Sequence, residues 1–332
     1  EEMYKIIKRT VTTIEKMDKW NGHLYNWYDT RTLDTLKPRY ISTVDSGNFV
    51  CYLITLKEGL SEYLNRPLIE KVFVDGMKDT IILANREVNE NIYEPDELKN
   101  IAANFDESES FDLKAWIRAL DKLGGNHGSK DKKVNVWSRK VDHMVSLFKN
   151  EINNYYSWSH LLFEVPEELK KGSYKNDIEK SIKTIFNLFG INVPLVKLPE
   201  HYKQIKFEID KLNKVITKNK ENHYVNIKNW LDRLKYELDK SIQNVEQLIS
   251  NYKYLVERID KLSRETEFIH LYDKKRQLFS IGYNIEESSL TNSYYDMLAS
   301  EARQTSFIAI ARGEVDAQHW FRLGRTLTRI DR

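Results

Sequence analysis

The sequence predicts an all-α protein on three observations. Only six prolines and 12 glycines occur among 332 residues, fewer than a loop-rich β fold uses. Leu, Ile, Lys and Glu are abundant, as is typical of helical proteins. Apolar residues recur at spacings of three and four across residues 201–263, without a proline or glycine. A chain of this length can bury a large core, in one large domain or two ordinary ones.

An amphipathic helix is expected over residues 3–17, where apolar residues follow helical spacing, and Asn21-Gly22 ends it. The block that continues to Tyr40 is rich in Trp, Tyr, Asn, Asp and Arg without a clean period, which predicts an ordered loop lining a site. Asp45 or Ser46 is expected to cap a helix over 47–64. Further helices are predicted over 67–85, 95–104 (opened by Pro95), 109–123 (opened by Ser110), 134–163 and 174–189, with a polar connector over 124–133 and an extended link over 190–199.

The most periodic stretch lies in the middle of the chain. Between Ile227 and Leu262 the apolar residues repeat at threes and fours, and the charges that flank them alternate in sign. This pattern predicts one long amphipathic helix or a hairpin of two helices over residues 201–263, with a solvated outer face.

A further helix is predicted over residues 294–311, because Ser293 resembles a helix cap and Gly313 a stop. Helical spacing places Glu301 in an otherwise apolar stripe that is expected to be buried. A carboxyl removed from water has a raised pKa, which suits a general acid near neutral pH. The alternative is a structural glutamate paired with a cation such as Arg303.

Two clusters combine aromatic rings with charged groups, as a sugar-binding surface does. The alternative is that Trp27, Trp320 and Phe321 are core residues, and that the arginines pair with helix ends or acidic neighbours. The two clusters consist of Trp27, Tyr28, Asp29 and Arg31, and of Tyr294, Tyr295, Trp320, Arg322 and Arg325.

Several blocks at both ends of the chain, about a third of it, carry a family resemblance. They include the runs GHLYNWYDTRTL, YYDMLASEAR and HWFRLGR. These blocks resemble the glucoamylase-like domain of cyclic β-1,2-glucan synthases, and they occur in the order found in that family. They cover residues 22–33, 38–40, 42–48, 271–273, 278–284, 294–303, 306–311 and 319–325.

The resemblance implies an (α/α)6 toroid that closes linear β-1,2-glucan into a ring by transglycosylation. In the family, this domain lies between a membrane-embedded glycosyltransferase and a phosphorylase-like domain, which are the expected partners at the cytoplasmic face of the cell membrane. The family pattern continues past Arg332, so the chain is expected to be one helical catalytic domain or its N-terminal part. Its segments would be an N-terminal helix with the aromatic loop, a helical region, the long periodic helices, and the motif-bearing end, over 1–60, 61–200, 201–265 and 266–332.

The implied chemistry needs two carboxyl groups that flank the glycosidic bond, about 5 to 5.5 Å apart in a retaining enzyme. Glu301 is the candidate acid/base. Asp29, Asp45 and Asp296 are the nearest second candidates, but Asp45 is better explained as a cap and Asp296 as a first-turn residue. The nucleophile is therefore expected beyond Arg332, and the chain alone is expected to be inactive. The substrate-binding residues that the resemblance implies are the two aromatic clusters together with Asp45, Asp296 and Arg303.

Composition argues against several other classes. The formal net charge is +2, so nothing favours nucleic acid as a partner. Cys51 is alone and cannot form an internal disulfide, and the eight histidines show no metal-ligand spacing, so neither metal nor cofactor is expected. No apolar run approaches the length of a membrane span. The glycines of residues 124–130 lack the spacing of a phosphate loop.

Two alternatives stay open at this stage. A hydrolytic endo-β-1,2-glucanase would use the same carboxyl chemistry with water as the acceptor. A non-catalytic helical scaffold, with residues 201–263 as a coiled-coil arm, would explain the periodic stretch but leave the two aromatic clusters unexplained.

Overall fold

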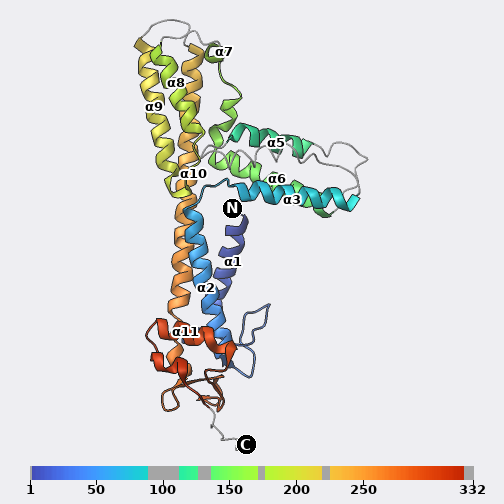
Figure 1. The fold of residues 1–332 in the computed structure, drawn as a ribbon, viewed down its shortest axis with the longest axis vertical. Helices are drawn as coiled ribbons and strands as arrows, with labels where there is room; N and C mark the ends of the chain where they lie inside the picture. Colours follow the sequence, from blue (N-terminus) through green and yellow to red (C-terminus); the bar gives the residue numbers. More distant parts are fainter. Residues whose placement is uncertain (1, 89–111, 126–135, 171–175, 219–224, 325–332) are drawn as a thin grey trace, which may run out of the picture. The chain divides into compact units, whose positions relative to one another are not determined.

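A computed structural model describes residues 2–88, 112–125, 136–170, 176–218 and 225–324. Helices predominate and the strands are short, so the predicted all-α class is confirmed (Figure 1). The chain divides into two compact units, with Glu1–Glu62 and Tyr252–Arg332 in unit 1 and Tyr63–Asn251 in unit 2. The predicted helix over 95–104 lies outside the described residues.

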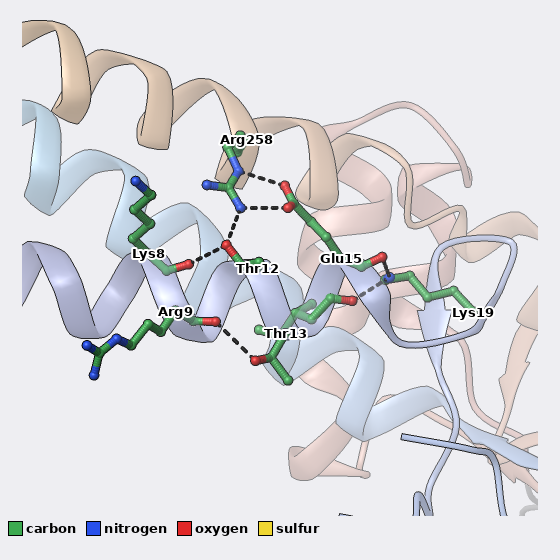
Figure 2. Close-up of polar contacts among 8 residues, drawn as sticks. Lys8, Arg9, Thr12, Thr13, Glu15, Lys19 and Arg258 are labelled. Atoms are coloured by element: carbon green, nitrogen blue, oxygen red, sulfur yellow. Dashed lines mark hydrogen bonds and ion pairs between the residues drawn. The ribbon is translucent and has the colours of Figure 1, made fainter. Parts of the chain in front are cut away.

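Unit 1 contains α1 (Glu2–Lys16), most of α2 (Thr43–Leu64), the end of α10 (Val225–Arg264) and α11 (Arg303–Ala311). Figure 2 shows how α1 is fastened to α10. The Arg258 guanidinium donates from Nε to Glu15 Oε1 at 2.9 Å, and from Nη2 to Glu15 Oε2 at 2.6 Å and Thr12 Oγ1 at 2.8 Å. The Lys19 ammonium donates to the Ile14 carbonyl at 2.6 Å, where α1 ends.

Short strands form three small sheets in unit 1. The first pairs β1 (Lys19–Trp20) with β2 (His23–Leu24) through a turn in which Asn21 and Gly22 both have positive φ. The second has the order β3-β6-β7, from Tyr40–Ser42, Gly282–Asn284 and Ser289–Leu290. The third has the order β4-β5-β8, from Tyr272–Asp273, Leu278–Ser280 and Tyr294–Tyr295. All pairings are antiparallel, so the aromatic block expected to be a loop also supplies strands.

One hydrophobic cluster joins α2, α11 and the sheets of unit 1. Helices α2 and α11 approach closely at Gly47, where an added Cβ would lie 1.9 Å from Thr305 Oγ1. The Thr305 hydroxyl donates to the Thr43 carbonyl at 2.9 Å, across the same contact. The buried members of the cluster are Tyr25, Ile41, Val50, Phe268, Leu271, Phe279, Ile308, Ala309 and Val315.

Unit 2 is helical in its described part. Helices α3 (Lys71–Val88) and α5 (Leu113–Gly125) pack on α6 (Val136–Tyr155), which is followed by the 3-10 helix η2 (Ser157–Leu162). Helix α8 (Asn176–Phe189) packs on α9 (Leu198–Lys218). The elements α7 (Glu167–Lys170) and η3 (Leu195–Lys197) are short turns of helix.

The periodic stretch forms two helices, α9 and α10, that pack as a hairpin (Figure 1). Of the two predicted forms, one long helix or a hairpin of two, the structure has the hairpin. Ion pairs join the two helices in antiparallel register. They are Lys203–Glu246 at 3.2 Å, Lys235–Asp210 at 2.5 Å, and Lys206–Asp239. Leu231, Leu234 and Leu238 of α10 are fully buried, so the apolar spacing identified the inner face correctly.

Several predicted boundaries were wrong for local reasons. The helix predicted over 134–163 ends at Tyr155, where the chain tightens into η2. The helix predicted over 109–123 begins at Leu113, because Asp112 Oδ1 accepts from the Ala115 backbone N–H at 3.0 Å and so caps it. The predicted cap Ser110 lies outside the described residues. The helix predicted from residue 67 begins at Lys71.

Candidate functional site

The third sheet of unit 1 carries the two tyrosines of the C-terminal motif in β8. The Tyr294 hydroxyl donates to Asp273 Oδ2 at 3.0 Å, and the Arg276 guanidinium carbon lies 4.6 Å from its ring centroid. Asp273 in turn accepts the Arg276 and Lys275 backbone N–H groups, and these bonds together with the Tyr294 hydroxyl lower the pKa of its carboxyl. The β4–β5 turn therefore holds Tyr294 in place.

Tyr295 brings the two ends of the chain together. Burial is the first cause that raises the pKa of its hydroxyl, followed by the charges of Glu301, Tyr40 and Asp45. Tyr295 is paired with Phe279 of the neighbouring strand β5. The negative charges of the candidate acid Glu301 and of Asp45 from the N-terminal motif thus both raise the pKa of one tyrosine hydroxyl.

The helix predicted over 294–311 was wrong in its first half. Tyr294 and Tyr295 pair with Ser280 and Phe279 as strands, so their backbone groups belong to a sheet. Regular helix begins only at Arg303, after the 3-10 turn η6 (Ser300–Ala302).

Glu301 therefore lies in η6 and is exposed, whereas the stripe predicted it to be buried. The helical spacing holds from Thr305 to Ile308, which are buried, but not for Leu298, which is 61% exposed. The desolvated carboxyl that the sequence predicted is not present in this structure.

Asp45 does not cap α2. The Ser42 hydroxyl accepts from the Asp45 backbone N–H at 3.3 Å, so Ser42 is the capping residue and Asp45 lies in the first turn. The Asp45 side chain is exposed, and a negative charge at this position is favourable beside the helix N-terminus.

Asp296, expected in a first helical turn, is buried in the loop after β8. Its Oδ1 accepts from the Leu298 backbone N–H at 3.0 Å, and its Oδ2 accepts from the Gly324 backbone N–H at 3.4 Å. The Met297 backbone N–H donates to the Arg322 carbonyl at 2.9 Å across the same contact. Asp296 thus joins the loop after β8 to the segment after η7 (Ala317–Phe321).

Arg303 and Trp320 form a close cation–π pair within the C-terminal motif. The Arg303 guanidinium carbon lies 3.4 Å from the Trp320 ring centroid. Trp320 is half-buried, whereas Phe321 is 72% exposed and so is not the core residue of the alternative interpretation. Arg322 is exposed, and Arg325 lies outside the described residues.

The N-terminal cluster lies on an ordered loop. Trp27 is 47% exposed, so it is not a core residue. The Tyr28 hydroxyl donates to the Asp18 carbonyl at 2.7 Å, and burial raises its pKa to about 12. Asp29 Oδ1 accepts from the backbone N–H groups of Arg31 at 2.8 Å and Thr32 at 3.3 Å, and these bonds lower the pKa of its carboxyl.

The two predicted clusters are not joined directly. Among the described residues, no hydrogen bond or ion pair links residues 27–31 to Glu301, Arg303 or Trp320. The N-terminal and C-terminal motif blocks are instead joined by the pairing of β3 with β6 and by the Thr305 hydroxyl, which donates to the Thr43 carbonyl at 2.9 Å.

Sequence reasoning assigned no role to two groups near this end. Glu314 Oε2 accepts from the backbone N–H groups of Phe268 at 2.5 Å and Ile269 at 3.2 Å, and burial raises the pKa of this carboxyl. The buried His319 ring contacts Ser306 Oγ at 2.8 Å and the Gln277 carbonyl at 3.1 Å, and burial lowers its pKa. A glutamate directly after the helix stop at Gly313 was the available signal for the first of these.

Neither a metal cluster nor a membrane span is found in the described part of the chain. No group of three or more His, Cys, Asp or Glu side chains there could hold a metal ion. Within the same residues, no helix combines the length and apolarity that crossing a bilayer requires.

The fold and this site define a mostly helical protein in which small sheets support tyrosine, arginine and carboxylate side chains. No family model matches the chain. The chain is 26% identical, over an alignment 338 positions long, to the cyclic beta-(1,2)-glucan synthase NdvB of Rhizobium meliloti (strain 1021). The alignment covers 99% of this chain and 10% of that protein. The family resemblance drawn from the motifs is thereby confirmed, and it extends through the middle of the chain.

Proposed function

We propose that this chain acts on β-1,2-linked glucan and contributes to closing linear chains into rings. The observation that carries the proposal is the similarity, along 99% of the chain, to a protein named a cyclic β-(1,2)-glucan synthase. The chain spans only 10% of that protein, so its synthase activity comes to this chain as part of the proposal.

The proposed reaction is a retaining transglycosylation with Glu301 as the acid/base. A covalent glycosyl intermediate must wait for a sugar hydroxyl, and this requires retention. Glu301 is exposed in the structure, so a glucan chain lying over it would exclude water from the carboxyl. A carboxyl shielded from water favours its protonated form, which can protonate the leaving oxygen.

The proposed substrate surface surrounds Tyr295. Sugar rings offer apolar faces and many hydroxyls, so aromatic planes beside fixed charges suit them. Arg303 lies over the Trp320 ring, and the charges of Asp45 and Glu301 both raise the pKa of the Tyr295 hydroxyl. The proposed binding residues are Trp27, Tyr28, Asp29, Arg31, Asp45, Tyr294, Tyr295, Asp296, Arg303, Trp320, Arg322 and Arg325.

The wider setting belongs to the same proposal. We place these helices in a larger helical catalytic domain of the (α/α)6 toroid type, in which another segment supplies the nucleophile. Glycosyltransferase and phosphorylase-like domains of a longer protein, at the cytoplasmic face of the cell membrane, would be the partners. The relative's greater length supports this setting.

The test is incubation of the chain with linear β-1,2-glucan, beside a Glu301→Gln variant. Glu287→Gln, which changes another exposed glutamate of unit 1, is the matched control. Products are measured by mass and by a reducing-end assay, because a ring has no reducing end. Because another segment is proposed to supply the nucleophile, the result expected for this chain is glucan binding without product. Rings that form and disappear only in Glu301→Gln would show that this chain holds both carboxyl groups, whereas new reducing ends point to a hydrolytic endo-β-1,2-glucanase.

A non-catalytic role is the second candidate, and the exposure of Glu301 favours it. A helical scaffold would use the α9–α10 hairpin, with its ion pairs, as an interaction arm. Glucan binding by calorimetry without any product would indicate a binding part of a larger catalytic unit. Neither binding nor product, together with a dimer that is lost when residues 198–251 are deleted, would overturn the glucan proposal in favour of the scaffold.

A further inference from the structure

Unit 2 has a pocket that none of the motif residues lines. It lies among α5, α6 and η2 and has a volume of about 340 Å³. This volume lies at the lower end of the range of roughly 300 to 1,000 Å³ found for small-molecule sites. The lining residues are Ile117, Leu120, Asp121, Lys149, Ile152, Asn153, Ser159, His160 and Phe163.

One part of the lining is apolar and contains an aromatic ring. Phe163 is 42% exposed, although it follows directly on a buried stretch of η2. Two cations one helical turn apart on α5 hold this ring, with Lys114 Nζ at 5.4 Å and Arg118 Cζ at 5.6 Å from its centroid. An exposed ring fixed in this way offers an apolar surface at little cost in conformational entropy.

The other part of the lining provides hydrogen-bonding groups of both kinds. The His160 ring contacts the Ser157 carbonyl through Nδ1 at 2.7 Å. Because a carbonyl only accepts, Nδ1 carries the proton, and Nε2 of the neutral ring is an acceptor. The exposed Asn153 amide can both donate and accept, as can the Ser159 hydroxyl.

The charges in the lining cancel. Lys149 Nζ and Asp121 Oδ1 lie 2.7 Å apart, so the ammonium and the carboxylate neutralise each other. The balanced ion pair does not require a charged ligand, and Lys114 and Arg118 are engaged with the Phe163 ring. Polar groups of both kinds beside an aromatic ring match a polyhydroxylated ligand that also has apolar faces.

We propose that this pocket is a second sugar-binding site, which takes a glucose unit of a glucan chain. The choice of β-1,2-glucan as the ligand rests on the function proposed above, whereas the match to a neutral sugar rests on the pocket itself. The proposed site lies in unit 2, whereas the residues around Tyr295 belong to unit 1.

The experiment is hydrogen–deuterium exchange of the full chain, with and without linear β-1,2-glucan. Slower exchange in peptides from residues 113–125 and 148–163 is expected, in addition to any change in residues 294–324. Protection of the pocket peptides alone would support the pocket while contradicting the site around Tyr295. Protection of residues 294–324 alone, or of neither region, would overturn the pocket proposal.

Two variants test the pocket itself. Asn153→Ala shortens an exposed helical side chain, and Phe163→Ala removes the ring. Each is expected to raise the glucan concentration needed for half protection of the pocket peptides by about tenfold, with residues 294–324 unaffected. Phe207→Ala is the matched control, because Phe207 is 58% exposed on α9 and also has a lysine, Lys211, over its ring. If both pocket variants behave as the control does, the pocket is not a sugar site.

Discussion

The Arg303 side chain both covers the indole ring of Trp320 and binds its backbone. The guanidinium carbon lies 3.4 Å from the ring centroid, and Nη1 donates to the Trp320 carbonyl at 3.0 Å. Arg303 begins α11, whereas Trp320 lies in η7, beyond the stop of that helix. One arginine therefore sets the position of an aromatic ring that the proposed function uses for glucan.

We expect Arg303→Lys to weaken this arrangement, because an ammonium cannot stack as a planar guanidinium does. The free energy of unfolding should fall by about 0.5 to 1 kcal/mol, the range for an incompletely buried cation–π pair. Chemical denaturation followed by tryptophan fluorescence measures the change. Arg276→Lys is the matched control, since Arg276 lies 4.6 Å from the Tyr294 centroid but its side chain is 56% exposed. An equal loss in both variants would contradict a special role for the Arg303 pair.

Gly47 permits the close contact of α2 with α11, and Gly47→Ala should disrupt it. An added Cβ would lie 1.9 Å from Thr305 Oγ1 and 3.0 Å from Thr305 Cα, so rotation of the threonine cannot relieve the clash. We expect a loss of several kcal/mol in the free energy of unfolding, above the roughly 1 to 3 kcal/mol typical of an overpacked core. Differential scanning calorimetry of the full chain would measure it.

Gly59→Ala in the same helix is the control for Gly47→Ala. Nothing lies within 4 Å of the Cβ that this substitution would add. Alanine is the better helix former, so Gly59→Ala should stabilise α2 by about 0.5 to 1 kcal/mol. Opposite signs for the two glycines are therefore expected. A stable Gly47→Ala variant would mean that α11 does not pack on α2 as described.

Sequence periodicity predicted the helices well where one face of a long segment is apolar. It identified α1 and α8 to within a few residues, and it left a hairpin as one of two forms for 201–263. Such patterns are local, because helical neighbours are three and four residues apart. The exact ends were less predictable, since a single side chain such as Asp112 decides where a helix begins.

The region around Glu301 could not be predicted from local pattern. Tyr294 and Tyr295 take their partners from β5, more than a dozen residues away, and Asp296 is held by the backbone of Gly324. These long-range contacts override a helical spacing that the sequence itself contains. The combined effect of the Asp45 and Glu301 charges on one tyrosine likewise depends on tertiary structure. Motif resemblance, rather than spacing, indicated which residues to consider.

His23 should make the protein less stable as the pH falls from about 6.5 towards 4. Its ring is buried and contacts the Glu267 carbonyl through Nε2 at 2.9 Å, and burial lowers its pKa from 6.5 to about 4. Between these two values the unfolded state holds more protons than the folded state, so stability rises with pH and is lost on acidification. The full loss from this residue is about 3 kcal/mol.

The measurement for His23 is the free energy of unfolding at several pH values between 7.5 and 4.5. His23→Gln keeps a donor for the Glu267 carbonyl and removes the titrating ring, so its stability should depend less steeply on pH. The slope is compared rather than the absolute stability, because the substitution also changes packing. Identical slopes for the parent and the variant would exclude His23 as a source of the pH dependence.

The ion pair between Glu15 and Arg258 should stabilise unit 1 more than an ordinary surface pair. Both guanidinium bonds to Glu15 are short, and the Arg258 side chain is only 13% exposed (Figure 2).

The Arg258 hydrogen bond is the main cause that lowers the pKa of Glu15, so the pair's contribution is present above pH 4.5 and is lost as the pH falls through the lowered value. We expect Glu15→Gln to cost about 1 to 2 kcal/mol at pH 7 and progressively less as the pH falls below 4.5, measured by urea unfolding over a series of pH values. Glu265→Gln, which breaks an exposed pair with Lys261, should cost less than about 0.5 kcal/mol at pH 7. If the two variants lose the same stability at pH 7, then Arg258 does not fasten α1 to α10 through its carboxylate bonds, and packing alone holds the helix.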